Sequence, residues 1–166
     1  NQEKIDEFIP SSIDLHSAAW LSADSYQLAE SAIRFETWER NIAGQIGLAT
    51  AVDYALNIGL DSIRQRIELL TKYFHKGANV LQEKLSILEN PSTELSGIIT
   101  FKRHGEEATQ TQNRLRSLGI NISISRSANT QLDNTMNGEQ WIGDRCRASL
   151  HYYNTEEEID QFLAAL

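Results

Sequence analysis

The chain has 166 residues, of which 40% are hydrophobic and 23% are charged, the composition of a globular domain with its own core rather than of a disordered segment. Its 15 basic and 23 acidic residues give a formal net charge of −8, and a surface of that sign repels the phosphates of nucleic acids and anionic lipids. We therefore expect no nucleic acid and no membrane as a partner.

Cysteine usage and the chain ends add three expectations. The single cysteine, Cys146, excludes an internal disulfide, and no cysteine pair or cysteine–histidine cluster predicts a metal site. A reducing, cytoplasmic location is the simplest interpretation. No apolar run approaches the roughly 20 residues that a membrane helix needs. The first residue is Asn1 and not methionine, so we expect a piece of a longer protein.

Residues 1–40 read as an irregular, partly extended arm and linker, with a short helical turn near Tyr26–Ser31. An arm of this length without its own structure is unusual in a compact domain and normally packs on another part of the protein. The sequence therefore divides into the arm, residues 1–40, and a domain with its connecting helices, residues 41–166.

Two helices are expected next. Asn41 is a suitable N-cap for a helix over residues 41–57, whose many small residues predict burial on more than one side. Apolar residues then recur at three- and four-residue spacing from Leu60 to Leu88, and Asn90 and Pro91 follow. This pattern predicts one long helix from residue 61 or 62 to about 89.

The remainder predicts a β-α-β-β-α series. Strands are expected over residues 97–102, 120–124 and 145–152, with a mostly polar helix over 105–118 and a long loop over 127–143. Thr155 and Glu158 form a capping box at the start of the last helix. A small, mostly antiparallel sheet with one apolar face covered by helices is an α+β fold.

The strand over residues 145–152 separates its side chains by type. Cys146 and Ala148 point to one face, whereas Arg145 and Arg147 point to the other. A guanidinium group presents a planar fork that matches a carboxylate, so the two arginines are candidates for a carboxylate-binding strip. The alternative is a solvated outer face with arginines paired to surface glutamates, and the strand pattern alone favours it.

The same strand and the helix after it resemble a known family. Residues 147–160 resemble the closing segment of class V aminotransferases, which include cysteine desulfurases and selenocysteine lyases. Further pieces resemble consecutive segments of that family in the same order, over essentially the whole chain. These pieces are Arg34–Thr37 with Asn41–Gly44, Ala51–Tyr54 with Ile58–Leu60, Gly97–Phe101, and Gly119–Ile122.

The resemblance implies the C-terminal domain of a fold-type-I enzyme that uses pyridoxal 5′-phosphate (PLP), with residues 1–40 left from the large domain. It also implies a homodimer, and an amino-acid substrate whose α-carboxylate is bound by Arg147. PLP chemistry needs a desolvated lysine held at the cofactor. The family's Schiff-base lysine lies before the region where this chain begins. We therefore expect no catalytic residue in this chain and no PLP bound to it alone.

A phosphate site is implied at the start of the first helix. Asn41 and Arg40 match a segment that lies near the PLP phosphate of the opposite subunit in relatives, and a helix N-terminus suits a phosphate. The chain has Trp38, Glu39 and Arg40 where many relatives have Gly-Thr-Pro, and Glu39 would repel a phosphate. A plain N-cap explains Asn41 equally well.

The loop after the second strand bears on the reaction. In desulfurases it carries a reactive cysteine, whereas residues 125–130 contain none, and Cys146 lies on an apolar face where a thiol is inert. Lyase or aminotransferase activity is therefore favoured over desulfurase activity, with epimerisation still open. Arg126, Ser127 and Asn129 are weaker candidates for lining a substrate pocket, although loop polarity predicts the same residues.

A second function class remains open for the chain as a whole. It would be a free-standing α+β module derived from such an enzyme, which binds a small carboxylate with the arginine strip or serves for dimerisation. A reading frame that continues upstream into a lysine-bearing PLP domain favours the enzyme, and a natural start at Asn1 favours the module.

Overall fold

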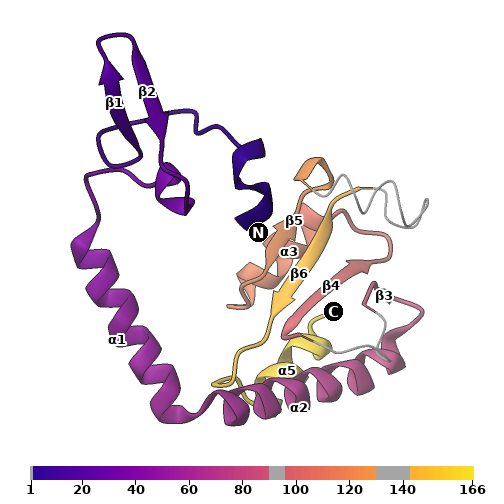
Figure 1. Cartoon of the computed structure of the whole chain (residues 1–166). Coiled ribbons are helices and arrows are strands. Elements are labelled where there is room, and N and C mark those ends of the chain that lie inside the picture. The colour runs from indigo at the N-terminus through magenta and orange to yellow at the C-terminus, as the bar shows by residue number, and fades with distance from the viewer. Residues whose placement is uncertain (1, 90–95, 130–142) are drawn as a thin grey trace. The chain divides into compact units, whose positions relative to one another are not determined.

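A computed structural model describes residues 2–89, 96–129 and 143–166 (Figure 1). Residues 1–54 and residues 55–166 form two compact units. The division at residue 40 that the sequence suggested stays a prediction. None of the helices in the described ranges combines the length and the apolar character that crossing a lipid bilayer requires.

The N-terminal unit has secondary structure of its own. The short 3₁₀ helices Gln2–Glu7 and Ala32–Phe35 flank an antiparallel hairpin of β1 (Ala18–Ser22) and β2 (Ser25–Leu28). Arg34 is buried and joins these parts, because its guanidinium group donates to the carbonyl oxygens of Ala29 and Ile5 and to the carboxylate of Asp6.

The predicted helical turn over Tyr26–Ser31 is wrong, since its first three residues lie in β2 and none of its residues is helical. The strand is specified by pairing: Trp20 faces Tyr26 across the hairpin, and the Oγ of Ser22 contacts the Oγ of Ser25 at 2.5 Å and donates to Asp24 in the turn. Cross-strand aromatic pairs stabilise such a hairpin, and they are not visible in a local helical pattern.

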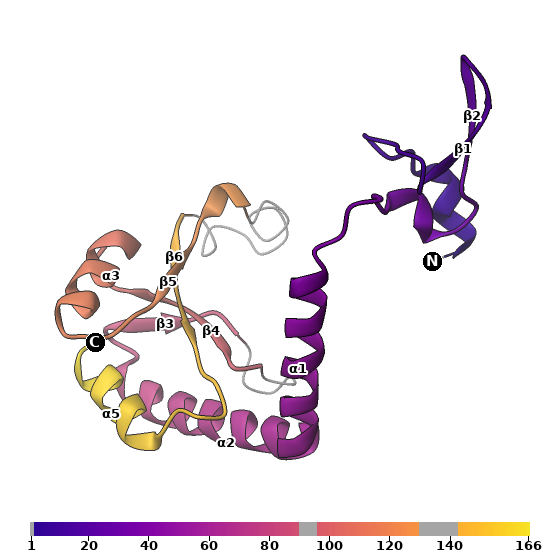
Figure 2. The same cartoon turned by 90° about the vertical axis from the view of Figure 1, so that its left-hand side faces the viewer.

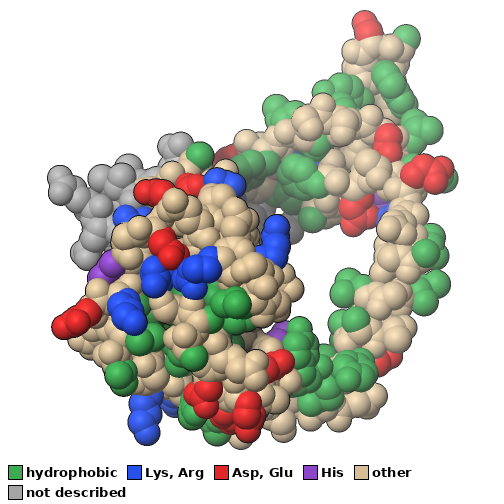
Figure 3. Space-filling model, turned by 180° about the vertical axis from the view of Figure 1, so that it is seen from behind, with side chains coloured by type: hydrophobic (Ala, Val, Ile, Leu, Met, Phe, Trp, Pro, Cys, Tyr) green, Lys and Arg blue, Asp and Glu red, His purple; other side chains and the backbone are tan. Residues whose placement is uncertain are grey.

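Helix α1 (Ile42–Ile58) begins as predicted, because the side-chain oxygen of Asn41 accepts from the N–H of Gly44 at 2.8 Å. None of its 17 residues is buried. Large apolar side chains along this helix and in the N-terminal hairpin are therefore exposed (Figure 3). On the helix these are Ile42, Ile46, Leu48, Val52, Tyr54, Leu56 and Ile58.

Helix α2 (Leu60–Ala78) ends about eleven residues earlier than the sequence predicted. A 3₁₀ turn over Asn79–Leu81 follows, and Leu85–Ile87 forms strand β3. Leucines at 81, 85 and 88 fit helical spacing, but Leu85 and Ile87 also alternate as a strand requires, and the ladder with Arg103 and Phe101 selects the strand. The glycine before α2, Gly59, has φ of 94° and turns the chain between the two helices.

The four-stranded sheet of the C-terminal unit has the order β3-β4-β6-β5, and all neighbours are antiparallel. Its other strands are β4 (Ile98–Arg103), β5 (Ser123–Ser125) and β6 (Arg145–Ser149). Helices α2, α3 (Ala108–Ser117) and α5 (Glu156–Ala164) cover one face of this sheet (Figures 1 and 2). The predicted α+β fold is confirmed.

The core lies between this sheet face and the three helices. Phe74 of α2 and Phe101 of β4 both pack against Phe162 of α5, with ring centroids 5.5 and 5.7 Å apart. Alternation along the strands gives the other sheet face mostly polar residues. The buried apolar residues are Leu70, Phe74, Ala78, Leu85, Ile99, Phe101, Ala108, Leu115, Cys146, Ala148, Ile159, Phe162 and Leu166.

Candidate functional site

Arg147 lies on the middle of β6, on the sheet face opposite to the one that α2, α3 and α5 cover. In the ladder it stands between Thr100 of β4 and Ser123 of β5, while its neighbours Cys146 and Ala148 are buried on the helix side. The side chain is exposed, and its Nε donates to the Oγ of Ser123 at 3.0 Å.

The two terminal nitrogens of Arg147 are available. Among the described residues no carboxylate lies within ion-pair distance of this guanidinium group. Ser123 orients the side chain through Nε and leaves the planar fork for a ligand. The described residues therefore do not show the alternative, in which the arginine pairs with a surface glutamate. The carboxylate-binding role stays a prediction.

The second arginine of the expected strip, Arg145, is buried, with 5% of its surface exposed. Its Nη1 donates to the carbonyl oxygen of Asp144 at 3.2 Å. It shares the strand face of Arg147, as alternation predicted, but it does not form part of an exposed strip. The prediction of two accessible arginines on this strand is wrong for Arg145, because neighbouring chain covers the start of β6.

Arg126 and Ser127 are both held by Asp144. The Nη1 of Arg126 donates to the Asp144 carboxylate at 2.8 Å, and the N–H and Oγ of Ser127 lie 3.0 and 3.3 Å from its other oxygen. The Ser127 N–H and then the Arg126 guanidinium lower the pKa of the Asp144 carboxyl group below its ordinary value. Asn129 is exposed nearby, and its N–H donates to the carbonyl oxygen of Arg126.

These contacts show what Asp144 does, a residue that the sequence did not single out. It fixes the end of β5 to the start of β6. A lone aspartate directly before a strand is a weak signal, and only the pairing of the strands shows its partners. Residues 130–142 of the loop lie outside the described residues, and the substrate-pocket role of Arg126, Ser127 and Asn129 stays a prediction.

The predicted phosphate ligands lie in the N-terminal unit. The side-chain oxygen of Asn41 caps α1, so the N-cap interpretation is confirmed. The guanidinium group of Arg40 donates to the Glu36 carboxylate at 2.6 Å and contacts the Nε2 of His16 at 2.7 Å. An arginine neutralised by its own glutamate is a poor phosphate ligand, although the role itself stays a prediction.

The lysines of the chain are the residues that could form a Schiff base with PLP. All five lysines of the chain, Lys4, Lys72, Lys76, Lys84 and Lys102, are exposed. A Schiff-base lysine works from a desolvated position next to the cofactor, and none of the five occupies one. The expectation that this chain alone does not bind PLP stays a prediction.

Cys146 is 1% exposed, and burial raises the pKa of its thiol to about 11. Its Sγ lies 3.5 Å from the carbonyl oxygen of Ala108. Among the described residues, no group of three or more histidine, cysteine or acidic side chains is placed to hold a metal ion.

We expect Cys146 to react with a thiol reagent such as an aromatic disulfide roughly 100-fold more slowly than a free cysteine, because only the thiolate reacts. The chromophore release should become fast and stoichiometric in denaturant. Rapid stoichiometric labelling of the native chain at neutral pH would contradict the burial of this thiol.

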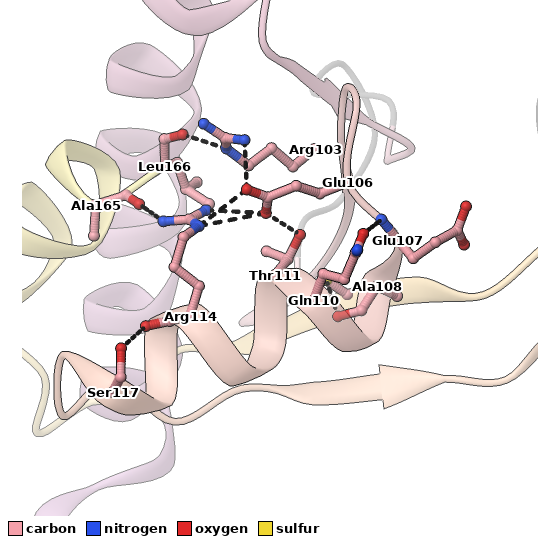
Figure 4. Close-up of polar contacts among 11 residues, drawn as sticks. Arg103, Glu106, Glu107, Ala108, Gln110, Thr111, Arg114, Ser117, Ala165 and Leu166 are labelled. Atoms are coloured by element: carbon pink, nitrogen blue, oxygen red, sulfur yellow. Dashed lines mark hydrogen bonds and ion pairs between the residues drawn. The ribbon is translucent and has the colours of Figure 1, made fainter.

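A polar cluster around Glu106 joins the end of β4, α3 and the last residues of the chain (Figure 4). The Glu106 carboxylate accepts from Arg103, Arg114 and Thr111. The two arginines also donate to the carbonyl oxygens of Leu166 and Ala165. Each charged group in this cluster has partners within it, so its role is to join α3 to the end of α5.

A cavity of about 480 Å³ lies between the end of β6 and α5, lined among others by Ala148, Leu150 and Phe162. Two of its polar residues are engaged, since the Asn154 amide donates to the Glu158 carboxylate at 3.0 Å and the Asn154 oxygen accepts from the N–H of His151. The cavity is therefore a weaker candidate for the site than the sheet face with Arg147.

Comparison with known proteins extends over almost the whole chain. The family model described as Aminotransferase class-V matches residues 6–162. A cysteine desulfurase of Salmonella agona is 32% identical over 140 residues, which are 83% of this chain and 32% of that protein. A probable cysteine desulfurase of Halobacterium salinarum is 29% identical over 133 residues, 80% of this chain and 31% of that protein.

Solved structures also resemble this chain in fold. The apo structure of a cysteine desulfurase from Thermococcus onnurineus NA1 superposes with a TM-score of 0.77 at 28% identity, over 98% of this chain and 39% of that chain. A cystine C–S lyase in complex with cysteine persulfide superposes with a TM-score of 0.70 at 21% identity, which shows the fold alone. The chain spans about a third of the length of the curated relatives it matches.

Proposed function

The chain belongs to the aminotransferase class-V family, and we propose that it forms the C-terminal portion of a PLP-dependent enzyme that acts on an amino acid. A preceding portion supplies the cofactor site and the Schiff-base lysine, and PLP when bound acts as the electron sink for the substrate's α-carbon. The shorter length of this chain relative to its relatives supports the division.

The observation that carries the proposal is the exposed guanidinium group of Arg147. It stands on the open sheet face, is oriented by Ser123, and has no carboxylate partner among the described residues. A planar fork fixed in this way binds the α-carboxylate of the substrate and sets the orientation of its α-carbon. No other residue of the chain is assigned a catalytic role.

The reaction we propose is that of a lyase or an aminotransferase. Desulfurase chemistry needs an accessible nucleophilic thiol that accepts sulfur from the substrate. The only cysteine of the chain, Cys146, is buried in the core, and burial raises the pKa of its thiol to about 11. The lack of a cysteine in residues 125–130 and the burial of Cys146 support a lyase or an aminotransferase over a desulfurase.

The exposed apolar side chains of α1 support the proposal that this chain packs against other protein. Helices of globular proteins bury an apolar stripe, whereas α1 has no buried residue. We propose that the preceding portion of the enzyme and a second subunit of a homodimer cover this helix. A reducing cytoplasmic setting completes the proposal and is supported by the cysteine content alone.

Absorbance spectroscopy with PLP tests whether the preceding portion of the protein supplies the cofactor site. The 166-residue chain mixed with equimolar PLP is expected to give only the spectrum of free PLP, because no lysine is desolvated. The full-length protein encoded by the same gene is expected to give the shifted band of a bound cofactor. A stoichiometric bound-cofactor band from this chain alone, or a gene that starts at Asn1, would refute the proposal and leave the free-standing module.

A further inference from the structure

The open face of the sheet carries more cations than Arg147. Side chains alternate along β4, so that Ile99 and Phe101 are fully buried on the helix side and Lys102 points to the open face. Ser86 of β3 stands directly opposite Lys102. One step further, the N–H of His104 donates to the carbonyl oxygen of Lys84, which continues the ladder. Lys84, Lys102 and His104 are all exposed.

Lys102 lacks an acidic partner. Among the described residues no carboxylate lies within ion-pair distance of the ammonium groups of Lys84 and Lys102 or of the guanidinium group of Arg147. Acidic residues outnumber basic ones by 23 to 15 in this chain, and eight ion pairs among the described residues occupy arginines elsewhere. Lys84, Lys102 and Arg147 are thus three exposed cations of this sheet face that have no ion-pair partner among the described residues.

The ladder places Lys102 next to Arg147. Thr100 stands directly opposite Arg147, and Lys102 is the next residue of β4 on the same face. Two steps along a strand are about 7 Å, and both side chains are long and flexible. Their charged heads can therefore approach the separation of the two carboxylates in an aspartate- or glutamate-sized molecule.

We propose that the substrate is an amino acid with a second anionic group on its side chain, and that Lys102 binds that group while Arg147 binds the α-carboxylate. The inference rests on the proposed function and deepens it by naming the substrate class. The two residues have different tasks: a fixed fork orients the α-carboxylate, and a mobile point charge on a longer reach accepts the side-chain anion. His104 is too far along the ladder from Arg147 to share one small substrate with it.

Paired substrates that differ in charge but hardly in shape test this assignment: aspartate against asparagine, and glutamate against glutamine. Their dissociation constants are measured on the full-length, PLP-loaded protein by calorimetry, which needs no turnover. The unaltered protein is expected to bind the acidic member of at least one pair about 10- to 100-fold more tightly, the range of a charge-assisted hydrogen bond. Lys102→Gln should abolish that preference and leave the binding of the amide unchanged.

Two further variants serve as controls for the loss of the positive charge at Lys102. Lys76→Gln removes an exposed cation from α2, on the helix side, and should leave the preference intact. Lys102→Arg keeps the charge and should retain most of the preference. The inference is overturned if the unaltered protein shows no acidic preference, or if Lys102→Gln weakens the acid and the amide equally.

The variant Arg147→Ala distinguishes a failure of this inference about Lys102 from a failure of the proposed function. If Arg147 binds the α-carboxylate, its loss weakens the binding of acid and amide alike. A protein in which Arg147→Ala weakens both members while Lys102→Gln leaves their ratio unchanged keeps the proposed function and loses the inference. A protein in which Arg147→Ala changes neither member loses both.

Discussion

Replacement of Arg147 by alanine in the full-length enzyme is expected to raise the KM for its amino-acid substrate by about 10- to 1,000-fold, the range of a lost charge-assisted pair. The side chain is exposed and contacts only Ser123 among the described residues, so its removal costs little stability. An interaction made equally in the ground state and the transition state changes KM more than kcat. Steady-state kinetics on the purified variant measure both.

Two control variants separate charge from geometry in this experiment. Arg147→Lys keeps the positive charge but not the planar fork, and we expect it to recover only part of the lost affinity. Arg116→Ala removes an exposed arginine from the last turn of α3 and should leave KM unaltered. A KM for Arg147→Ala equal to that of the unaltered enzyme would remove the basis for the carboxylate site.

The elements that the sequence predicts correctly are those determined locally. The capping box of Thr155 and Glu158 forms as expected, with both reciprocal hydrogen bonds in place, and Asn41 caps α1. These signals need only neighbouring residues. The α2–β3 boundary depends instead on pairing between Leu85 and Arg103, which are far apart in sequence, and helical spacing of leucines concealed it.

The candidate site, too, could be predicted only in part from the sequence. Strand alternation is enough to place Arg147 and Arg145 on the polar face. It does not predict which of the two side chains is buried, and the buried one is Arg145. The ladder between β4 and β6 brings Lys102 beside Arg147, although 44 positions separate them in the sequence. The sequence alone does not predict this proximity, because it depends on the pairing of strands that are far apart in the chain.

The Glu106 cluster supports the second prediction, which concerns stability. Glu106 is half-buried beside Arg103 and Arg114, so the variant Glu106→Gln leaves two guanidinium groups without their counter-charge on the helix side of the sheet. Removing one partner of a buried pair costs about 3–5 kcal/mol, and the partial exposure here reduces this to about 2–3 kcal/mol. The docking of α5 on α3 should weaken, since both arginines also hold carbonyl oxygens at the end of α5.

Amide hydrogen exchange in α3 and α5 measures this loss in the full-length protein, as the free energy of local opening. A loss of about 2–3 kcal/mol corresponds to exchange roughly 30- to 150-fold faster. Glu83→Gln, which changes an exposed glutamate near β3, is the matched control and should leave these amides unaffected. Unaltered protection of α3 and α5 in Glu106→Gln would show that the cluster does not hold them together.

The pH dependence of the same exchange gives an independent check. Burial raises the pKa of the Glu106 carboxyl group, but hydrogen bonds from Arg114 and Thr111 outweigh it, and the pKa lies below its ordinary value. A depressed pKa stabilises the folded state fully above the unfolded pKa of about 4.3. That stabilisation is lost as the pH falls through the lower, folded value. The difference between Glu106→Gln and the unaltered protein should therefore be largest near neutral pH and shrink below pH ~4, where the carboxylate takes up its proton.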